Sequence, residues 1–173
     1  HSFPTRRSSD LKLLEQRAYT DAHTGLLNKD ACEVLLNNKE TVAKHTACMM
    51  FDLNNLKIIN DTKGHSKGDQ LILNFARLLR NVIPQKDFVG RYGGDEFMVV
   101  IYNTSKTEIE DILKQLSREK DRLNSSGNNM PIDYACGWAI SDADSECTIQ
   151  MLLDKADYYM YENKQAYKKS KKS

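Results

Sequence analysis

The sequence has few of the features that mark secreted, membrane or nucleic-acid-binding proteins. Only 4 cysteines occur in 173 residues, and they form no Cys-x-x-Cys pair, so we expect neither disulfides nor zinc. No apolar run approaches the roughly 18 residues of a membrane-spanning helix, and no signal peptide is recognisable. Lys and Arg number 25 against 24 Asp and Glu, which indicates neither nucleic-acid nor membrane binding. We expect one soluble, cytoplasmic domain.

The ends of the chain differ from its middle. Residues 1–10 have no initiating Met and no periodicity, and we interpret them as a non-native or disordered leader. Residues 11–19 have helical spacing and are interpreted as a linker helix that enters from an upstream region. The folded domain is expected at 20–168, followed by a basic, solvated tail at 169–173.

Hydrophobic spacing in the middle of the chain predicts alternating helices and strands. Apolar runs predict strands at 46–51, 89–92, 97–101 and 132–140. Helical spacing predicts helices at 28–36, 71–82, 106–123 and 148–167, with a loop at 64–69 and a break at 125–129. Residues 53–63 are predicted to form a polar connection with one helical turn. This order is typical of an α+β fold of the ferredoxin-like kind, a mostly antiparallel sheet flanked by helices.

The stretch Arg91-Tyr92-Gly93-Gly94-Asp95-Glu96-Phe97 joins two of these strands. Gly93 and Gly94 predict a two-residue primed turn, because glycine reaches positive φ angles. Asp95 and Glu96 follow at once, and two carboxylates about 4 Å apart repel by roughly 4 kcal/mol. A divalent cation would reverse that repulsion, and bare glycines would let a ligand approach the backbone. The alternative is a surface hairpin with solvated acids.

A second acid, Asp52, ends the predicted strand at 46–51. If the ends of the two strands lie at one edge of the sheet, the carboxylates of Asp52 and Asp95 converge there. Such an oxygen site suits Mg²⁺ or Mn²⁺, and Mg²⁺ usually completes its coordination with water and substrate phosphates. The arrangement therefore points to a nucleoside triphosphate.

Several motifs in order resemble the GGDEF domain of the diguanylate cyclase family. The resemblance covers 20–168 and begins with Asp21-x-x-Thr24-Gly25-Leu26-x-Asn28, where His23 replaces the usual Leu. It continues with Asp52-x-x-x-x-Lys57-x-x-Asn60-Asp61-x-x-Gly64-His65-x-x-Gly68-Asp69, where Asn54 replaces a common Asp, and with the 93–97 pentapeptide. Ala156-Asp157, Met160-Tyr161 and Lys164 match the last helix. The resemblance implies a nucleotide-cyclase-like fold.

The resemblance also implies roles for individual residues. The metal would be held by Asp52, the backbone carbonyl of Leu53 and Asp95. Asp95 or Glu96 would remove a proton from the attacking hydroxyl. The substrate would contact Asn60 and Asp69 through its guanine edge, Lys57, Lys164 and Lys168 through its triphosphate, and also His65, Gly93 and Gly94. The alternatives are a helix cap for Asp69, a turn former for Asn60 and solvated lysines.

The implied reaction condenses two GTP into cyclic di-GMP and two pyrophosphates. It requires a homodimer, because each chain binds one GTP, and an upstream sensor region would control that dimer. The alternatives are a receptor module that binds GTP or cyclic di-GMP without turnover, or a structural dimerisation domain. Many relatives carry an inhibitory product site, Arg-x-x-Asp, before the hairpin. Here Pro84 stands in place of the arginine and Asp87 remains, so we expect that site to be absent or degenerate.

Overall fold

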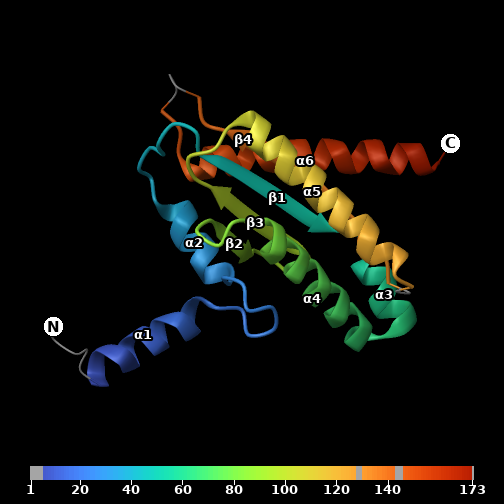
Figure 1. Cartoon of the computed structure of the whole chain (residues 1–173), viewed down its shortest axis with the longest axis horizontal. Coiled ribbons are helices and arrows are strands. Elements are labelled where there is room, and N and C mark those ends of the chain that lie inside the picture. Colours follow the sequence, from blue (N-terminus) through green and yellow to red (C-terminus); the bar gives the residue numbers. More distant parts are fainter. Residues whose placement is uncertain (1–5, 128–129, 143–145, 173) are drawn as a thin grey trace.

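The computed structural model describes residues 6–127, 130–142 and 146–172, in which helices and strands follow the predicted order (Figure 1). The strands are β1 (Ala47–Leu53), β2 (Phe88–Arg91), β3 (Glu96–Ile101) and β4 (Tyr134–Ile140). The helices are α1 (Arg6–Tyr19), α2 (Lys29–Asn37), α3 (Leu56–Lys63), α4 (His65–Val82), α5 (Lys106–Ser125) and α6 (Ile149–Lys171). None of the helices within these ranges is long and apolar enough to cross a bilayer.

The sheet is antiparallel throughout, with the strand order β2-β3-β1-β4. β1 lies in the middle, and each of its residues faces a partner on β3 or β4. Asp52 pairs across the strands with Glu96 on one side and Ala135 on the other. The predicted α+β fold is therefore confirmed, and the register brings Asp52 next to the end of the hairpin.

Alternation along β1 divides the core into two layers. Met49 and Phe51 pack with residues of α4 and α5. Cys48 and Met50 point the other way and pack with residues of α2 and α6. This follows from the period of two in a strand, which sends successive side chains to opposite faces. Figure 1 shows α4 and α5 on one side of the sheet and α6 on the other.

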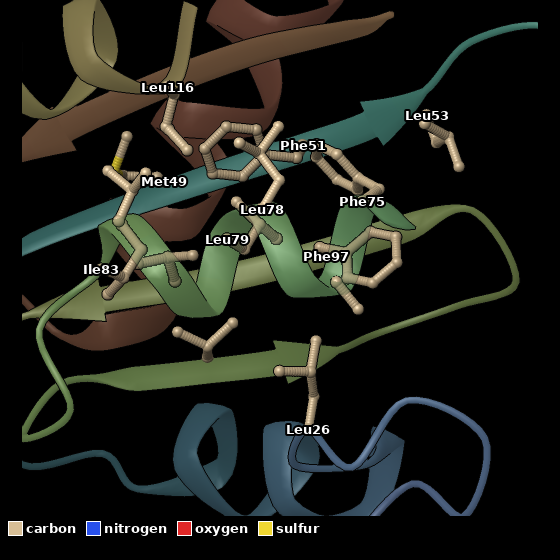
Figure 2. Close-up of a cluster of buried hydrophobic side chains, with 14 of the residues drawn as sticks. Leu26, Met49, Phe51, Leu53, Phe75, Leu78, Leu79, Ile83, Phe97 and Leu116 are labelled. Carbon is tan, nitrogen blue, oxygen red and sulfur yellow. The ribbon is translucent and has the colours of Figure 1, made fainter. Parts of the chain in front are cut away.

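Aromatic rings fix the strand ends that carry the acids (Figure 2). Phe75 of α4 packs edge-on against Phe51 and Phe97, with ring centroids 5.9 Å and 5.0 Å apart. All three rings are fully buried, and burying a Phe side chain contributes about 1.5–3 kcal/mol. Phe51 precedes Asp52 and Phe97 follows Glu96, so both acids are attached to closely packed backbone.

Asn28 joins α1 to α2 through its side chain and its backbone. The Asn28 side-chain nitrogen donates to the carbonyl of Ala18 (2.8 Å), and the Asn28 backbone N–H donates to the carbonyl of Tyr19 (2.9 Å). The Asn28 side-chain oxygen accepts from the N–H of Ala31 (3.0 Å) and so caps α2, as predicted. α1 itself projects away from the sheet (Figure 1).

The hairpin turn differs from the prediction. Residues 92–95 connect the strands, and neither Gly93 nor Gly94 has a positive φ angle, so the prediction of a two-residue primed turn was wrong. The N–H groups of Tyr92 and Gly93 both donate to the carbonyl of Glu96, at 2.8 Å and 3.2 Å. This four-residue tip lets both glycines keep ordinary backbone angles.

Helix also replaces two predicted irregular segments. α3 is an eight-residue helix within the predicted polar connection, and α4 begins at His65 within the predicted loop. Gly64 explains both differences, since its φ of 88° lets its N–H end α3 on the Asn60 carbonyl while its own carbonyl starts α4. α6 continues to Lys171 through most of the predicted basic tail.

Residues of the predicted leader, break and tail fall partly outside the described ranges. The leader residues 6–10 belong to α1. Residues 1–5, Asn128, Asn129 of the predicted break and Ser173 of the predicted tail lie outside the described residues.

Candidate active site

Asp52 provides a buried carboxylate with one oxygen to spare. The residue is 8% exposed, and its Oδ2 atom pairs with the Lys164 ammonium at 2.5 Å. Its Oδ1 atom is buried and has no hydrogen-bond partner among the residues that the structure describes. Leaving a buried acceptor unpaired costs about 1–3 kcal/mol. A cation or a hydrogen-bond donor that contacts this oxygen would therefore stabilise the protein.

Asp95 in the hairpin tip and Glu96 at the start of β3 lie close to Asp52. The N–H of Leu53 donates to the Asp95 carbonyl at 2.8 Å, which fixes the tip beside β1. Burial and then the charge of Asp52 raise the pKa of Asp95. Burial raises the pKa of Glu96 too, with the charges of Asp52, Asp95 and Asp157 acting in the same direction. Lys164 offsets part of this repulsion. The sequence motif of the last helix includes Asp157, but no site role was predicted for this residue.

These oxygens have the chemistry that Mg²⁺ prefers. The carboxylates of Asp52 and Asp95 and the backbone carbonyl of Leu53 match its usual protein ligands. The Oδ1 atom of Asp52, which has no partner among the described residues, could contact this ion. Within residues 6–127, 130–142 and 146–172, no three His, Cys, Asp or Glu side chains are already grouped as a metal centre. Magnesium or manganese binding at this position stays a prediction.

A basic cleft of about 450 Å³ opens beside the acids. The structure brings together here five of the predicted residues, namely Leu53, Lys57, Asp95, Lys164 and Lys168. Tyr167, Lys171 and Lys172 also line the cleft. Lys171 and Lys172 were missed because 169–173 was predicted to be a solvated tail, and no role was predicted for Tyr167 within the last helix. The spacing of Lys164, Lys168 and Lys171 on one helical face was the available signal.

The two residues predicted to contact guanine, Asn60 and Asp69, lie on the neighbouring helices α3 and α4. Gly68 is buried, and a Cβ atom there would lie 1.7 Å from the Asn60 side-chain oxygen. Asn60 on α3 therefore lies against α4 one residue before Asp69, which is exposed. Gly64 is the N-cap of α4, so the alternative of Asp69 as its cap is wrong, and Asn60 lies within a helix rather than a turn. His65 opens α4 and is exposed.

Arg91 holds the hairpin tip. Its Nη2 and Nε atoms donate to the Gly94 carbonyl at 3.0 Å and 3.3 Å, while Nη1 contacts the Asp21 carboxylate at 3.4 Å. A Cβ atom on Gly94 would meet nothing within 4 Å, so the packing of the protein itself does not require glycine there. Gly93 and Gly94 line a cleft of about 460 Å³ with Asp21 and Arg91. Arg91 was missed as a site residue, although its place directly before the tip was the signal.

In the segment 84–87, where we expect the product site to be absent or degenerate, the acid is buried. Asp87 is 5% exposed, and its Oδ1 atom accepts from the N–H of Tyr102 at 3.1 Å. Pro84 is exposed three residues earlier. The carboxylate thus holds the chain where β3 ends, while its Oδ2 atom is buried without a hydrogen-bond partner among the described residues.

Comparisons with known proteins agree on the family. Residues 18–170 match the sequence model of the family described as diguanylate cyclase, GGDEF domain. Diguanylate cyclase DgcP of Escherichia coli is 29% identical over 95% of this chain and 49% of its own length. Cyclic di-GMP phosphodiesterase PdeB of Shewanella oneidensis is 32% identical over 83% of this chain and 17% of its own length. The chain spans less than half of either relative.

Solved structures share the fold. The coiled coil and GGDEF domain of DgcB from Caulobacter crescentus, in complex with c-di-GMP, aligns with a TM-score of 0.78 and 25% identity. The alignment covers 93% of this chain and 88% of that one.

Proposed function

We propose, from the premise that this chain belongs to the GGDEF-domain family, that it is a diguanylate cyclase that condenses two GTP into cyclic di-GMP and two pyrophosphates. One observation carries the proposal. Asp52, Asp95 and Glu96 lie close enough to repel one another, and Asp95 also lines a cleft that presents Lys57, Lys164 and Lys168. Acids beside a concentration of cations suit a substrate that brings both phosphates and a metal.

The lysines and the helix ends would bind the nucleotide. Lys57, Lys164 and Lys168 would neutralise triphosphate oxygens as flexible point charges. The Asp69 carboxylate would accept hydrogen bonds from the N1–H and the exocyclic amine of guanine, and Asn60 would complete that edge. Adenine offers no such pair of donors, so these contacts select guanine.

Glu96 or Asp95 would act as the general base. A raised pKa makes a carboxylate a better proton acceptor at neutral pH, and burial beside other acids supplies that rise. The base takes the proton of a 3′-hydroxyl, whose oxygen bonds to the α-phosphorus of the other GTP while the bond to pyrophosphate breaks. Mg²⁺ or Mn²⁺, held by Asp52, Asp95 and the Leu53 carbonyl, would supply Lewis-acid stabilisation of the phosphates.

The reaction needs two chains. One chain offers one set of guanine and phosphate contacts, so two copies must face each other for each hydroxyl to reach the other nucleotide. A two-fold homodimer satisfies this requirement. α1 precedes the domain, and we assign it to coupling the dimer to an upstream sensor region in the cytoplasm.

We further propose that product does not inhibit through the segment 84–87. Proline provides no charged donor, and the Asp87 carboxylate already accepts from the Tyr102 N–H. Progress curves with added cyclic di-GMP test this. Strong non-competitive inhibition at micromolar product that is lost in Asp87→Ala would overturn it.

A receptor role is the second candidate, because a phosphodiesterase is among the relatives. One experiment separates the two. The domain is incubated with GTP and Mg²⁺, with and without EDTA, and cyclic di-GMP is quantified by chromatography. We expect cyclic di-GMP that disappears with EDTA. Binding of GTP or cyclic di-GMP without turnover, at concentrations where the domain is dimeric, would favour the receptor.

A further inference from the structure

One histidine connects the opening turn, residues 20–28, to the helix that carries Asp69. The Nε2 atom of His23 lies 2.9 Å from the backbone carbonyl oxygen of Asp69, a residue 46 positions away. A carbonyl oxygen only accepts hydrogen bonds, so Nε2 is the protonated nitrogen in this contact. A leucine, the usual residue of the family pattern at this position, could not donate there.

The first turn of α4 is not stabilised by a side-chain cap or by an acid of its own. Its N-cap is Gly64, which provides no side-chain hydrogen bond, and no acid lies in its first turn. Asp69 is itself exposed. The Asn60 side chain packs against Gly68 from one side, and His23 holds the next carbonyl from another. The position of the Asp69 carboxylate therefore depends on contacts from outside its helix.

The opening turn is a firm support for the histidine. Asp21 accepts from the Thr24 N–H (2.9 Å) and hydroxyl (2.6 Å) and pairs with Arg91. Leu26 is 4% exposed and belongs to the core beside α4. Both flanks of His23 are thus fixed, and its imidazole is held over α4 at little further entropic cost.

We infer that His23 is a positioning residue for guanine recognition. By holding the Asp69 carbonyl, it sets the start of α4 so that the Asp69 carboxylate meets the N1–H and the exocyclic amine of the base together. This inference rests on the proposed function and adds a specificity determinant outside the residues that touch the nucleotide. It concerns the preference for GTP over ITP, since inosine lacks the exocyclic amine.

The test compares GTP with ITP in the whole chain. Dissociation constants and steady-state kinetics are measured for wild type, His23→Leu and His23→Gln, whose amide can still donate. His45→Asn is the matched control. His45 is an exposed histidine that precedes the first residue of β1, at the end of the strand opposite to Asp52, and its φ of 64° suits asparagine. Melting temperatures of all variants are recorded.

We expect His23→Leu to lower the GTP-to-ITP preference about two- to tenfold, the usual value of one hydrogen bond, through KM with kcat unchanged. His23→Gln should recover part of the preference, and His45→Asn should match wild type. In an Asp69→Ala background the preference should already be low, and adding His23→Leu should not change it further.

Three results would overturn the inference. The first is a wild-type preference in His23→Leu with an unchanged melting temperature. The second is an equal loss for GTP and ITP, which indicates general damage. The third is a further loss from His23→Leu in the Asp69→Ala background. If wild type neither binds nor converts GTP, the proposed function fails first and the inference with it, which is a distinguishable outcome.

Discussion

The acid cluster and the guanine-contact region are built in different ways. Asp52 and Glu96 are paired across two central strands and are backed by the buried rings of Phe51 and Phe97. Asn60 and Asp69 stand on α3 and α4, where Asp69 is exposed and polar contacts determine its place. The difference teaches that the acids are fixed by the core, whereas the choice of base, in the function that we propose, would depend on a few side chains. Changes in the two regions should therefore fail in different ways.

The largest expected effect comes from Asp95→Asn. It removes one charge from the acid cluster without altering volume, so turnover should fall by about 10²–10⁴-fold while the melting temperature stays constant. Glu110→Gln is the control, because Glu110 is a surface acid that pairs with Lys106 at 3.9 Å. Cyclic di-GMP formation and thermal unfolding measure both properties. A folded Asp95→Asn variant with full activity would refute the metal and base assignments.

Gly94→Ala should damage ligand binding but not the fold. The new methyl meets no protein atom within 4 Å, so the free energy of unfolding should change by less than about 0.5 kcal/mol. GTP turnover should fall, because the methyl would occupy space that the nucleotide needs. Urea denaturation and steady-state kinetics test the two halves. Normal kinetics would mean that the nucleotide does not approach this glycine.

Gly68→Ala should, in contrast to Gly94→Ala, lower the stability of the fold. Its methyl would overlap the Asn60 side-chain oxygen, 1.7 Å from the Cβ position. We expect a loss of about 1–3 kcal/mol in the free energy of unfolding, together with weaker GTP binding, as α3 and α4 move apart. The same urea series, run beside Gly94→Ala, gives the comparison. A stability equal to wild type would show that Asn60 simply rotates away.

Asn54→Asp tests the residue that departs from the family pattern. The Asn54 side-chain nitrogen donates to the Asp133 carboxylate at 3.3 Å. An aspartate would lose that donor and face a like charge, so stability should fall by about 1 kcal/mol at neutral pH. The loss should shrink in Asn54→Asp combined with Asp133→Asn. If the single variant is instead as stable as wild type and needs less Mg²⁺, residue 54 would belong to the metal site.

The smallest expected effect is on the pH dependence of stability. Burial alone would raise the pKa of Asp21, but hydrogen bonds from Thr24 and the charge of Arg91 outweigh it and hold that pKa below its ordinary value of 3.8. A lowered folded pKa stabilises the protein above the unfolded pKa, and this contribution disappears as pH falls through the folded pKa. Asp21→Asn should therefore lose stability against wild type at neutral pH, and the difference should narrow below about pH 5. Parallel melting curves over pH provide the measurement.

Sequence patterns predicted what depends on local periodicity. Strand alternation and helical spacing gave the order of elements. Asp52 and Asp95 approach each other because the end of β1 lies beside the start of its antiparallel neighbour β3. The predicted start of α4 was wrong. Gly64 ends one helix and begins the next, and in the sequence such a glycine is typical of a loop. The Arg91 and His23 contacts were missed because each joins segments far apart in sequence.

The Asn28 amide has a mechanical consequence. Its nitrogen holds the last turn of α1 and its oxygen holds the first turn of α2, so the two helices form an elbow with a fixed angle. A torque applied along α1 would reach α2 through these two hydrogen bonds. The same elbow closes the turn that carries Asp21 and His23, whose contacts reach the hairpin tip and α4 respectively. A rotation of α1 would therefore act on the hairpin tip and on the start of α4 at once.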